Sequence, residues 1–132
     1  MASRNYKYYQ PNKMDLKDNY GDCAIRTICK SENLDWLDAY DLMYHYSREV
    51  QCPMNCKHGF EYILKKLGYT YTPISNKKGT KRPTVDRFSK DHNNGTFILV
   101  VANHYVCSKD GNYYDTWDSG DKSLYGYWTK GE

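Results

Sequence analysis

A cysteine at the start of a predicted helix is the first residue whose type and position suit covalent chemistry. Cys23 follows Gly21 and Asp22, and Asp22 is a good N-cap for a helix with an apolar stripe of Ala24, Ile25, Ile28 and Cys29. Only the thiolate of Cys is a nucleophile, and the free N–H groups and dipole at a helix start favour that negative charge. Cys23 is therefore a candidate nucleophile, although a Cys in this position is more often a small core residue.

A predicted hairpin near the C-terminus offers the partners that such a thiol needs. A nucleophilic Cys requires an imidazole that holds the thiolate and protonates the leaving group, and a third group that orients the ring. Asp110-Gly111 is a strong two-residue turn signal, which places His104 opposite Trp117 and makes Asp115 its diagonal neighbour on the same face. We expect His104 and Asp115 to touch, with Trp117 covering their contact from water.

The order Cys23, His104 and Asp115 along the chain resembles that of the papain-like cysteine peptidase superfamily, and in particular a small member of phage type. The resemblance is carried by Cys23 at a helix start, by Asn103-His104 on a strand that follows an apolar strand, and by Asp115-Thr116-Trp117, which is similar to the family's Asn-Ser-Trp. It covers about residues 19 to 128 in the order of elements. It implies a Cys23-His104-Asp115 triad, with Asp in place of the orienting Asn, and a shielding role for Trp117.

Two departures from the family pattern concern the oxyanion hole and the size of the chain. Family members usually carry Gln or Asn six residues before the nucleophile, where this chain has Lys17. The nearest amide is Asn19, so we expect Asn19 and the backbone N–H of Cys23 to bind the oxyanion. The 132 residues are little more than the minimal core of the superfamily, which favours a narrow or small substrate.

Apolar periodicity predicts helices in the first half of the chain and strands in the second. The first helix covers about residues 23 to 30. In the second, capped by Asn33 and ending near residue 47, we expect Leu37, Tyr40, Met43 and Tyr44 to be buried and Asp35, Asp38 and Asp41 to face solvent. A third helix ends at Gly68, and one helical turn follows Thr84. Strands are predicted at 69–74, 96–102, 104–108, 112–117 and 124–128.

These elements predict an α+β fold in which N-terminal helices pack on a C-terminal antiparallel β-sheet, as in papain-like proteins. A chain of 132 residues forms one domain, so we expect a single papain-like domain over 1–132, with residues 1–18 as an irregular lead-in segment. The run 96–102 is apolar and β-branched throughout, which is typical of a central strand.

Composition narrows the classes of protein that the chain can belong to. Lys and Arg exceed Asp and Glu by only 19 to 16, which falls short of the balance typical of nucleic-acid binders. No apolar run suits a signal peptide or a membrane span, and five Cys without a secretory signal are expected as reduced thiols. We therefore expect a cytoplasmic protein with no membrane partner. Because the chain is rich in Lys, Asn, Tyr and Asp, we expect its cell to be a bacterium or a phage-infected host.

Other chemistry-bearing groups have a plainer interpretation beside the functional one. Cys52, Cys56 and His58 could form half of a zinc site, with Cys107 as a further ligand, but zinc sites usually show two well-spaced pairs, so we expect free thiols and no metal or cofactor.

The basic loop around Gly79 could bind phosphate, yet short charge runs are usually solvated; its residues are Lys77, Lys78, Lys81 and Arg82. Tyr6, Tyr8 and Tyr9 could stack on bases, although packing on the body is the commoner outcome. His45 and His92 receive no role.

The sequence thus favours a cysteine-dependent hydrolase of an amide bond, peptide or isopeptide, with a protein or peptide substrate; the same residues also suit transglutamination and deamidation. A second hypothesis is a catalytically silent papain-like interaction protein of phage origin that binds a host protein. A third is a zinc-stabilised nucleic-acid module.

Overall fold

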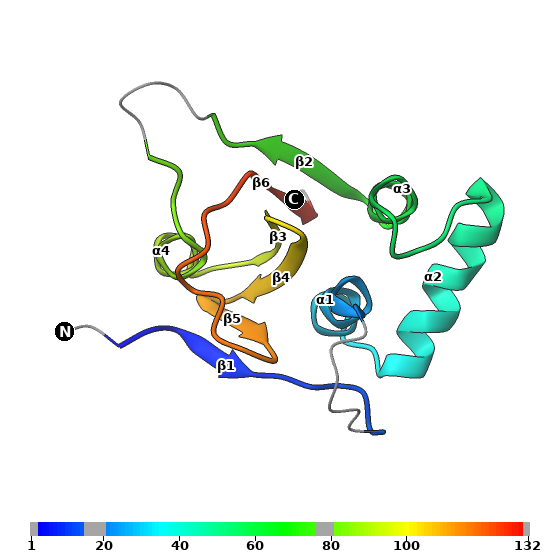
Figure 1. Cartoon of the computed structure of the whole chain (residues 1–132), viewed down its shortest axis with the longest axis horizontal. Helices are drawn as coiled ribbons and strands as arrows, with labels where there is room; N and C mark the ends of the chain where they lie inside the picture. The colour runs from blue at the N-terminus through cyan, green and yellow to red at the C-terminus, as the bar shows by residue number, and fades with distance from the viewer. Residues whose placement is uncertain (1–2, 15–20, 76–80, 131–132) are drawn as a thin grey trace.

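The computed structural model describes residues 3–14, 21–75 and 81–130, which form four helices and one six-stranded sheet (Figure 1). The helices are α1 (Cys23–Glu32), α2 (Trp36–Val50), α3 (Lys57–Lys66) and α4 (Val85–Asp91). The strands are β1 (Tyr6–Tyr8), β2 (Tyr69–Pro73), β3 (Thr96–Val101), β4 (His104–Lys109), β5 (Asn112–Asp115) and β6 (Gly126–Lys130). The fold class is α+β, as predicted. Among these helices none is long and apolar enough to cross a membrane.

The sheet has the strand order β1-β5-β4-β3-β6-β2, with β3 and β4 in its interior. All neighbouring pairs are antiparallel except β1 and β5, which run parallel. The sheet is therefore mixed, and the prediction of an irregular segment over 1–18 is wrong for Tyr6–Tyr8. Three residues are too few to show a period of two, and their partner strand lies near the other end of the sequence.

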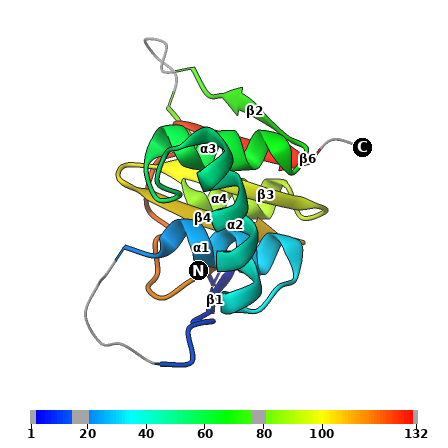
Figure 2. The same cartoon turned by 90° about the vertical axis from the view of Figure 1, so that its right-hand side faces the viewer.

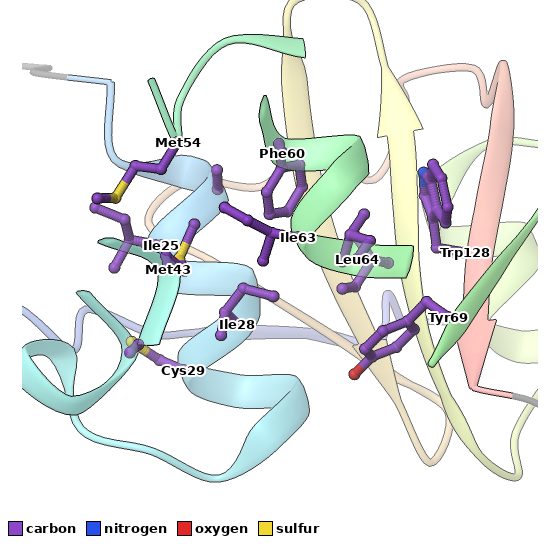
Figure 3. Close-up of a cluster of buried hydrophobic side chains, with 13 residues drawn as sticks. Ile25, Ile28, Cys29, Met43, Met54, Phe60, Ile63, Leu64, Tyr69 and Trp128 are labelled. Carbon is purple, nitrogen blue, oxygen red and sulfur yellow. The ribbon is translucent and has the colours of Figure 1, made fainter. Parts of the chain in front are cut away.

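The sheet separates two apolar layers. Helices α1, α2 and α3 lie on one side of it, and α4 lies on the other (Figures 1 and 2). The larger core joins the three helices to one face of the sheet (Figure 3), with Ile28, Met43, Phe60, Ile63, Leu64 and Ile98 at zero exposure. The smaller core packs α4 on the other face and includes Val85, Phe88, Leu99, Val106 and Tyr113. Neighbouring residues such as Ile98 and Leu99 serve opposite cores because side chains alternate along a strand.

The first helix buries the predicted stripe, but its caps differ from the prediction. Asp22 occupies the N-cap position of α1, yet its side chain accepts no hydrogen bond from the helix backbone. Asn33 ends α1 in the left-handed conformation, with φ 62°, instead of starting α2. The N-cap of α2 is Asp35, whose side chain accepts a hydrogen bond of 2.8 Å from the backbone N–H of Asp38.

The buried face of α2 is rotated from the predicted one. Met43 is fully buried as predicted, but its companion in the core is Ala39, whereas Leu37 is 68% exposed and Tyr44 is 48% exposed. Trp36, Tyr40 and Tyr44 stack on one another along the helix, with ring centroids 5.3 and 6.1 Å apart. The predicted face contains Leu37 and Tyr40, and the observed face contains the residues one position earlier. Ala39 is small and only weakly apolar, so the sequence pattern did not indicate that it is buried.

The turn at Asp110-Gly111 has the conformation that its sequence predicts. Asp110 and Gly111 both have positive φ, 50° and 89°, as a type I′ turn requires. The pairing of Cys107 with Tyr114 therefore follows the predicted register. The last two strands differ in extent from the prediction, because β5 ends at Asp115 and β6 covers Gly126–Lys130.

Candidate active site

Cys23 is the first residue of α1, and its side chain is partly buried where the helix begins. The helix lies against β4 and β5 and packs by its apolar stripe into the larger core. The chain before it carries Gly21 in a left-handed conformation, with φ 73°. This packing fixes the N-terminal turn of α1 beside the ends of two strands.

His104 and Asp115 meet at one end of the sheet. His104 is the first residue of β4, directly after a tight connection from β3 in which Asn103 has φ 54°. Asp115 is the last residue of the antiparallel neighbour β5. The two side chains form a hydrogen bond of 2.7 Å between His104 Nε2 and Asp115 Oδ2. The contact predicted from the hairpin register is thus present.

Asp115 is 1% exposed, and donors surround its carboxylate. Besides His104, Oδ2 accepts a hydrogen bond of 2.8 Å from the hydroxyl of Ser119. Oδ1 accepts one of 2.8 Å from the N–H of Thr116 and one of 3.3 Å from Arg26 Nη2. A buried charge with this many donors is compensated and held in one orientation.

The thiol of Cys23 and the imidazole of His104 interact and perturb each other. Burial by itself raises the pKa of the Cys23 thiol, but its hydrogen bonds with His104 and the backbone of Tyr105, and the charges of His104 and Arg26, leave that pKa below its ordinary value. Burial by itself lowers the pKa of His104, but hydrogen bonds and charge interactions with Asp115 and Cys23 raise it to about 9. Both shifts favour a thiolate beside an imidazolium.

Trp117 lies on the outer side of this arrangement. Its ring centroid is 5.0 Å from that of His104, with 33° between the planes, and the residue is 43% exposed. Lys122 Nζ lies 5.9 Å from the centroid of the indole ring. The indole therefore has the position expected of a cover, although β5 ends before it could pair with His104 in the ladder.

Comparisons with protein-family models, curated proteins and solved structures find no significant match. The likeness to papain-like peptidases therefore rests on the residues described above.

Arg26 and Ser119 are site residues that the sequence analysis did not identify. Arg26 is the one cation among residues 23–29 of α1 and stands four residues after Asp22, which could have marked it as a buried ion-pair partner. Ser119 is fully buried, but an isolated Ser in a loop carries no signal in the sequence. Asn19, the predicted oxyanion-hole donor, lies outside the described residues.

The other candidate groups do not join this site. All five Cys are free, with Cys107 buried and Cys56 exposed, and among the described residues no three His, Cys, Asp or Glu gather as a metal site. Lys77 and Lys78 lie outside the described residues, whereas Arg82 lies over the ring of Tyr125 at 5.0 Å. Tyr6 and Tyr9 pack on rings of β5, and Tyr8 is exposed.

A groove of about 390 Å³ opens beside the start of α1. It is lined by Gly21, Asp22, Ile25, Trp36, Tyr40, Tyr44, Ser47, Pro53, Met54 and Asn55. Gly21 and Asp22 directly precede Cys23, so one end of the groove adjoins the thiol-bearing turn. A second hollow on the outer side of α2 includes none of the candidate site residues.

Proposed function

We propose that the protein is a cysteine-dependent hydrolase of amide bonds that uses Cys23, His104 and Asp115. The observation that carries the proposal is the part-buried 2.7 Å contact of His104 with Asp115, together with the interaction of His104 with a thiol at a helix start. The lowered pKa of Cys23 and the raised pKa of His104 support it, because a reactive thiolate needs both. Papain-like peptidases have the same order of residues.

In the proposed reaction the Cys23 thiolate attacks the carbonyl carbon of an amide. The imidazolium of His104 donates its proton to the departing nitrogen, the C–N bond breaks, and a thioester on Cys23 remains. His104, now neutral, takes a proton from water, whose oxygen attacks the thioester; the C–S bond breaks, the carboxylic acid is released, and the Cys23 thiolate is restored beside the His104 imidazolium. Asp115 holds the ring throughout, and the N–H of Cys23 with Asn19 would stabilise the oxyanion.

The substrate class that fits is a peptide or isopeptide. The groove lined by Gly21 and Asp22 has a volume of about 390 Å³, which can accommodate a side chain of the acyl segment, and these two residues directly precede the proposed nucleophile. Five free thiols suit a reducing compartment, so we place the reaction in the cytoplasm of a bacterium or of a phage-infected cell.

A second candidate function is that of a catalytically silent protein that binds a host protein. The stacked, exposed rings on α2 favour it, because aromatic side chains are enriched at protein interfaces. The two functions differ in their demand on Cys23. An enzyme needs a reactive thiolate, whereas a binding protein tolerates Cys23→Ala.

The test is the rate of iodoacetamide labelling of Cys23 from pH 4 to 10, followed by peptide mass spectrometry. Because the pKa of Cys23 is lowered, we expect labelling on the acid side of the ordinary thiol range near pH 8.5. In His104→Ala the rise should move toward that range. Amide hydrolysis should fall above about pH 9, because His104 then loses the proton that the leaving group requires.

Two controls make the labelling experiment specific. The exposed Cys56 in the same digest is the reference thiol, and His45→Ala removes an exposed imidazole outside the site. Labelling of Cys23 that rises only near pH 8.5 in both the wild type and His104→Ala contradicts the proposed chemistry and favours the binding protein.

A further inference from the structure

Arg26 pairs with two buried carboxylates, those of Asp22 and Asp115. Its Nη1 pairs with Oδ1 of Asp22, and its Nη2 lies 3.3 Å from Oδ1 of Asp115. The side chains of Arg26, Asp22 and Asp115 are 11%, 5% and 1% exposed. This guanidinium thus joins the start of α1 to the end of β5, the two elements whose juxtaposition the proposed reaction requires.

Asp22 adds a buried negative charge at the start of α1. After burial, this charge is the next cause that raises the pKa of Cys29 on the same helix. Cys23 is adjacent to Asp22 in the chain, and a buried carboxylate disfavours a second negative charge nearby. The indole N–H of Trp36 donates a hydrogen bond of 3.1 Å to Oδ2 of Asp22, but it brings no charge. Arg26 is the cation that pairs directly with Asp22, and its charge is also among the factors that lower the pKa of Cys23.

Among the residues that the structure describes, Arg26 and His104 are the two cations of the site. The side chains that interact with the thiol are Arg26 on α1 and His104 and Tyr105 on β4. Asp115 on β5 contacts His104 and Arg26, and Asp22 before α1 contacts Arg26. On β1, Tyr6 donates to the backbone oxygen of Asp115, not to its carboxylate. A thiolate at Cys23 would be the third anion beside Asp22 and Asp115, so the group is left with one uncompensated negative charge when Arg26 and His104 are both charged, and with two when Arg26 is removed.

We propose that Arg26 is a positioning residue for the Cys23–His104 pair, which it serves by neutralising Asp22 and by clamping the Asp115 carboxylate in the orientation that faces His104. The inference rests on the proposed function. A guanidinium suits this role because its planar fork addresses two carboxylates at once, which the single ammonium of Lys does not. If Arg26 served stability alone, its replacement would lower the free energy of unfolding but leave the reactivity of the Cys23 thiol in the folded protein unchanged.

The test compares Arg26→Gln with the wild type in the iodoacetamide profile of Cys23. We expect the rise in labelling to move up by about one pH unit, with about tenfold slower labelling on the acid side, because one neighbouring charge is lost. Arg87→Gln is the matched control, since Arg87 is exposed and pairs with Asp91 on the same helix. Circular dichroism and urea titration establish that each variant is folded.

The double variant Asp22→Asn/Arg26→Gln separates charge compensation from folding. It removes the opposing carboxylate together with the guanidinium, so it should fold even where the single variant does not, and it should regain most of the acid-side labelling. A wild-type labelling profile in Arg26→Gln overturns the proposed role of Arg26, while the hydrolase proposal stands. The same conclusion follows if the double variant labels no faster than Arg26→Gln. Where Arg26→Gln does not fold, the double variant is compared with the wild type, and labelling about tenfold slower than the wild type overturns the role of Arg26. A wild-type protein that itself labels only near pH 8.5 overturns both.

Discussion

Asp115 is the residue on which the geometry of the candidate site converges. Its two oxygens accept hydrogen bonds from His104, Ser119, Thr116 and Arg26, so the carboxylate has no freedom to rotate away from the imidazole. Charge-assisted hydrogen bonds are each worth about 1.5–3 kcal/mol. An imidazole held at Nε2 in this way presents one fixed ring orientation to Cys23.

Replacing Asp115 with Asn tests how the charge of His104 is maintained. Asn keeps the shape of the side chain but removes the negative charge that offsets burial of the imidazolium. We expect the pKa of His104 to fall from about 9 by more than about one unit, because burial then dominates. The measurement is a titration of the His104 ring by heteronuclear NMR.

Asp118→Asn is the control for this substitution. Asp118 pairs with Arg4 and Tyr113 and makes no contact with His104 among the interactions of the described residues. The pKa of His104 should be unchanged in this variant. An equal fall in both variants, or none in Asp115→Asn, would mean that Asp115 does not set the charge of the ring.

At the level of single residues, the sequence predicted those contacts that follow from local rules. The turn at Asp110-Gly111 sets the register of its hairpin, and the register brings His104 to Asp115. Arg26 and Ser119 reach the same carboxylate from a distant helix and an irregular loop. No pairing rule connects these segments, so their convergence requires the three-dimensional fold.

At the level of elements, α2 shows why amphipathic periodicity alone leaves the buried face ambiguous. Leu37, Tyr40 and Tyr44 have helical spacing, and so do Trp36, Ala39 and Met43. The second set packs on the core, because small Ala39 lets the helix approach closely, while the large rings of the first set cover one another on the surface. Helix positions were thus predictable, whereas helix rotation depended on packing.

Paired truncations on α2 test this rotation. Met43→Ala should lower the free energy of unfolding by about 2–5 kcal/mol, because it leaves a cavity in the larger core. Leu37→Ala removes a side chain that is 68% exposed and should change it by about 0.5 kcal/mol or less. Urea titrations of both variants give these values. Similar losses in the two variants would mean that α2 packs through the face predicted from its periodicity.

At the scale of the whole molecule, the N-terminal segment completes the sheet that carries the candidate site. Strand β1 pairs parallel with β5, and the backbone N–H of Tyr9 donates a hydrogen bond of 2.9 Å to the carbonyl of Asp115. The site thus draws on the first residues of the described chain, on α1, and on the hairpin of β4 and β5. Such a distant pairing leaves no local signal, which is why the sequence analysis missed β1.

Tyr6 and Tyr8 lie on the same short strand and provide a matched test of that pairing. Tyr6 packs its ring on Tyr113 at 5.7 Å and donates a hydrogen bond of 3.1 Å to the Asp115 carbonyl, whereas Tyr8 is 66% exposed. Tyr6→Ala should lower the free energy of unfolding by about 1–3 kcal/mol, and Tyr8→Ala by about 0.5 kcal/mol or less.

Hydrogen exchange then locates the loss caused by Tyr6→Ala. The amide of Tyr113 donates to the carbonyl of Asn5, so its exchange should accelerate more in this variant than that of amides in the central strand β3. Because β5 ends in Asp115, a loosened β1 should also increase the mobility of the carboxylate that holds His104. Equal acceleration at Tyr113 and in β3 would instead indicate that β1 contributes only to global stability and does not fasten the site locally.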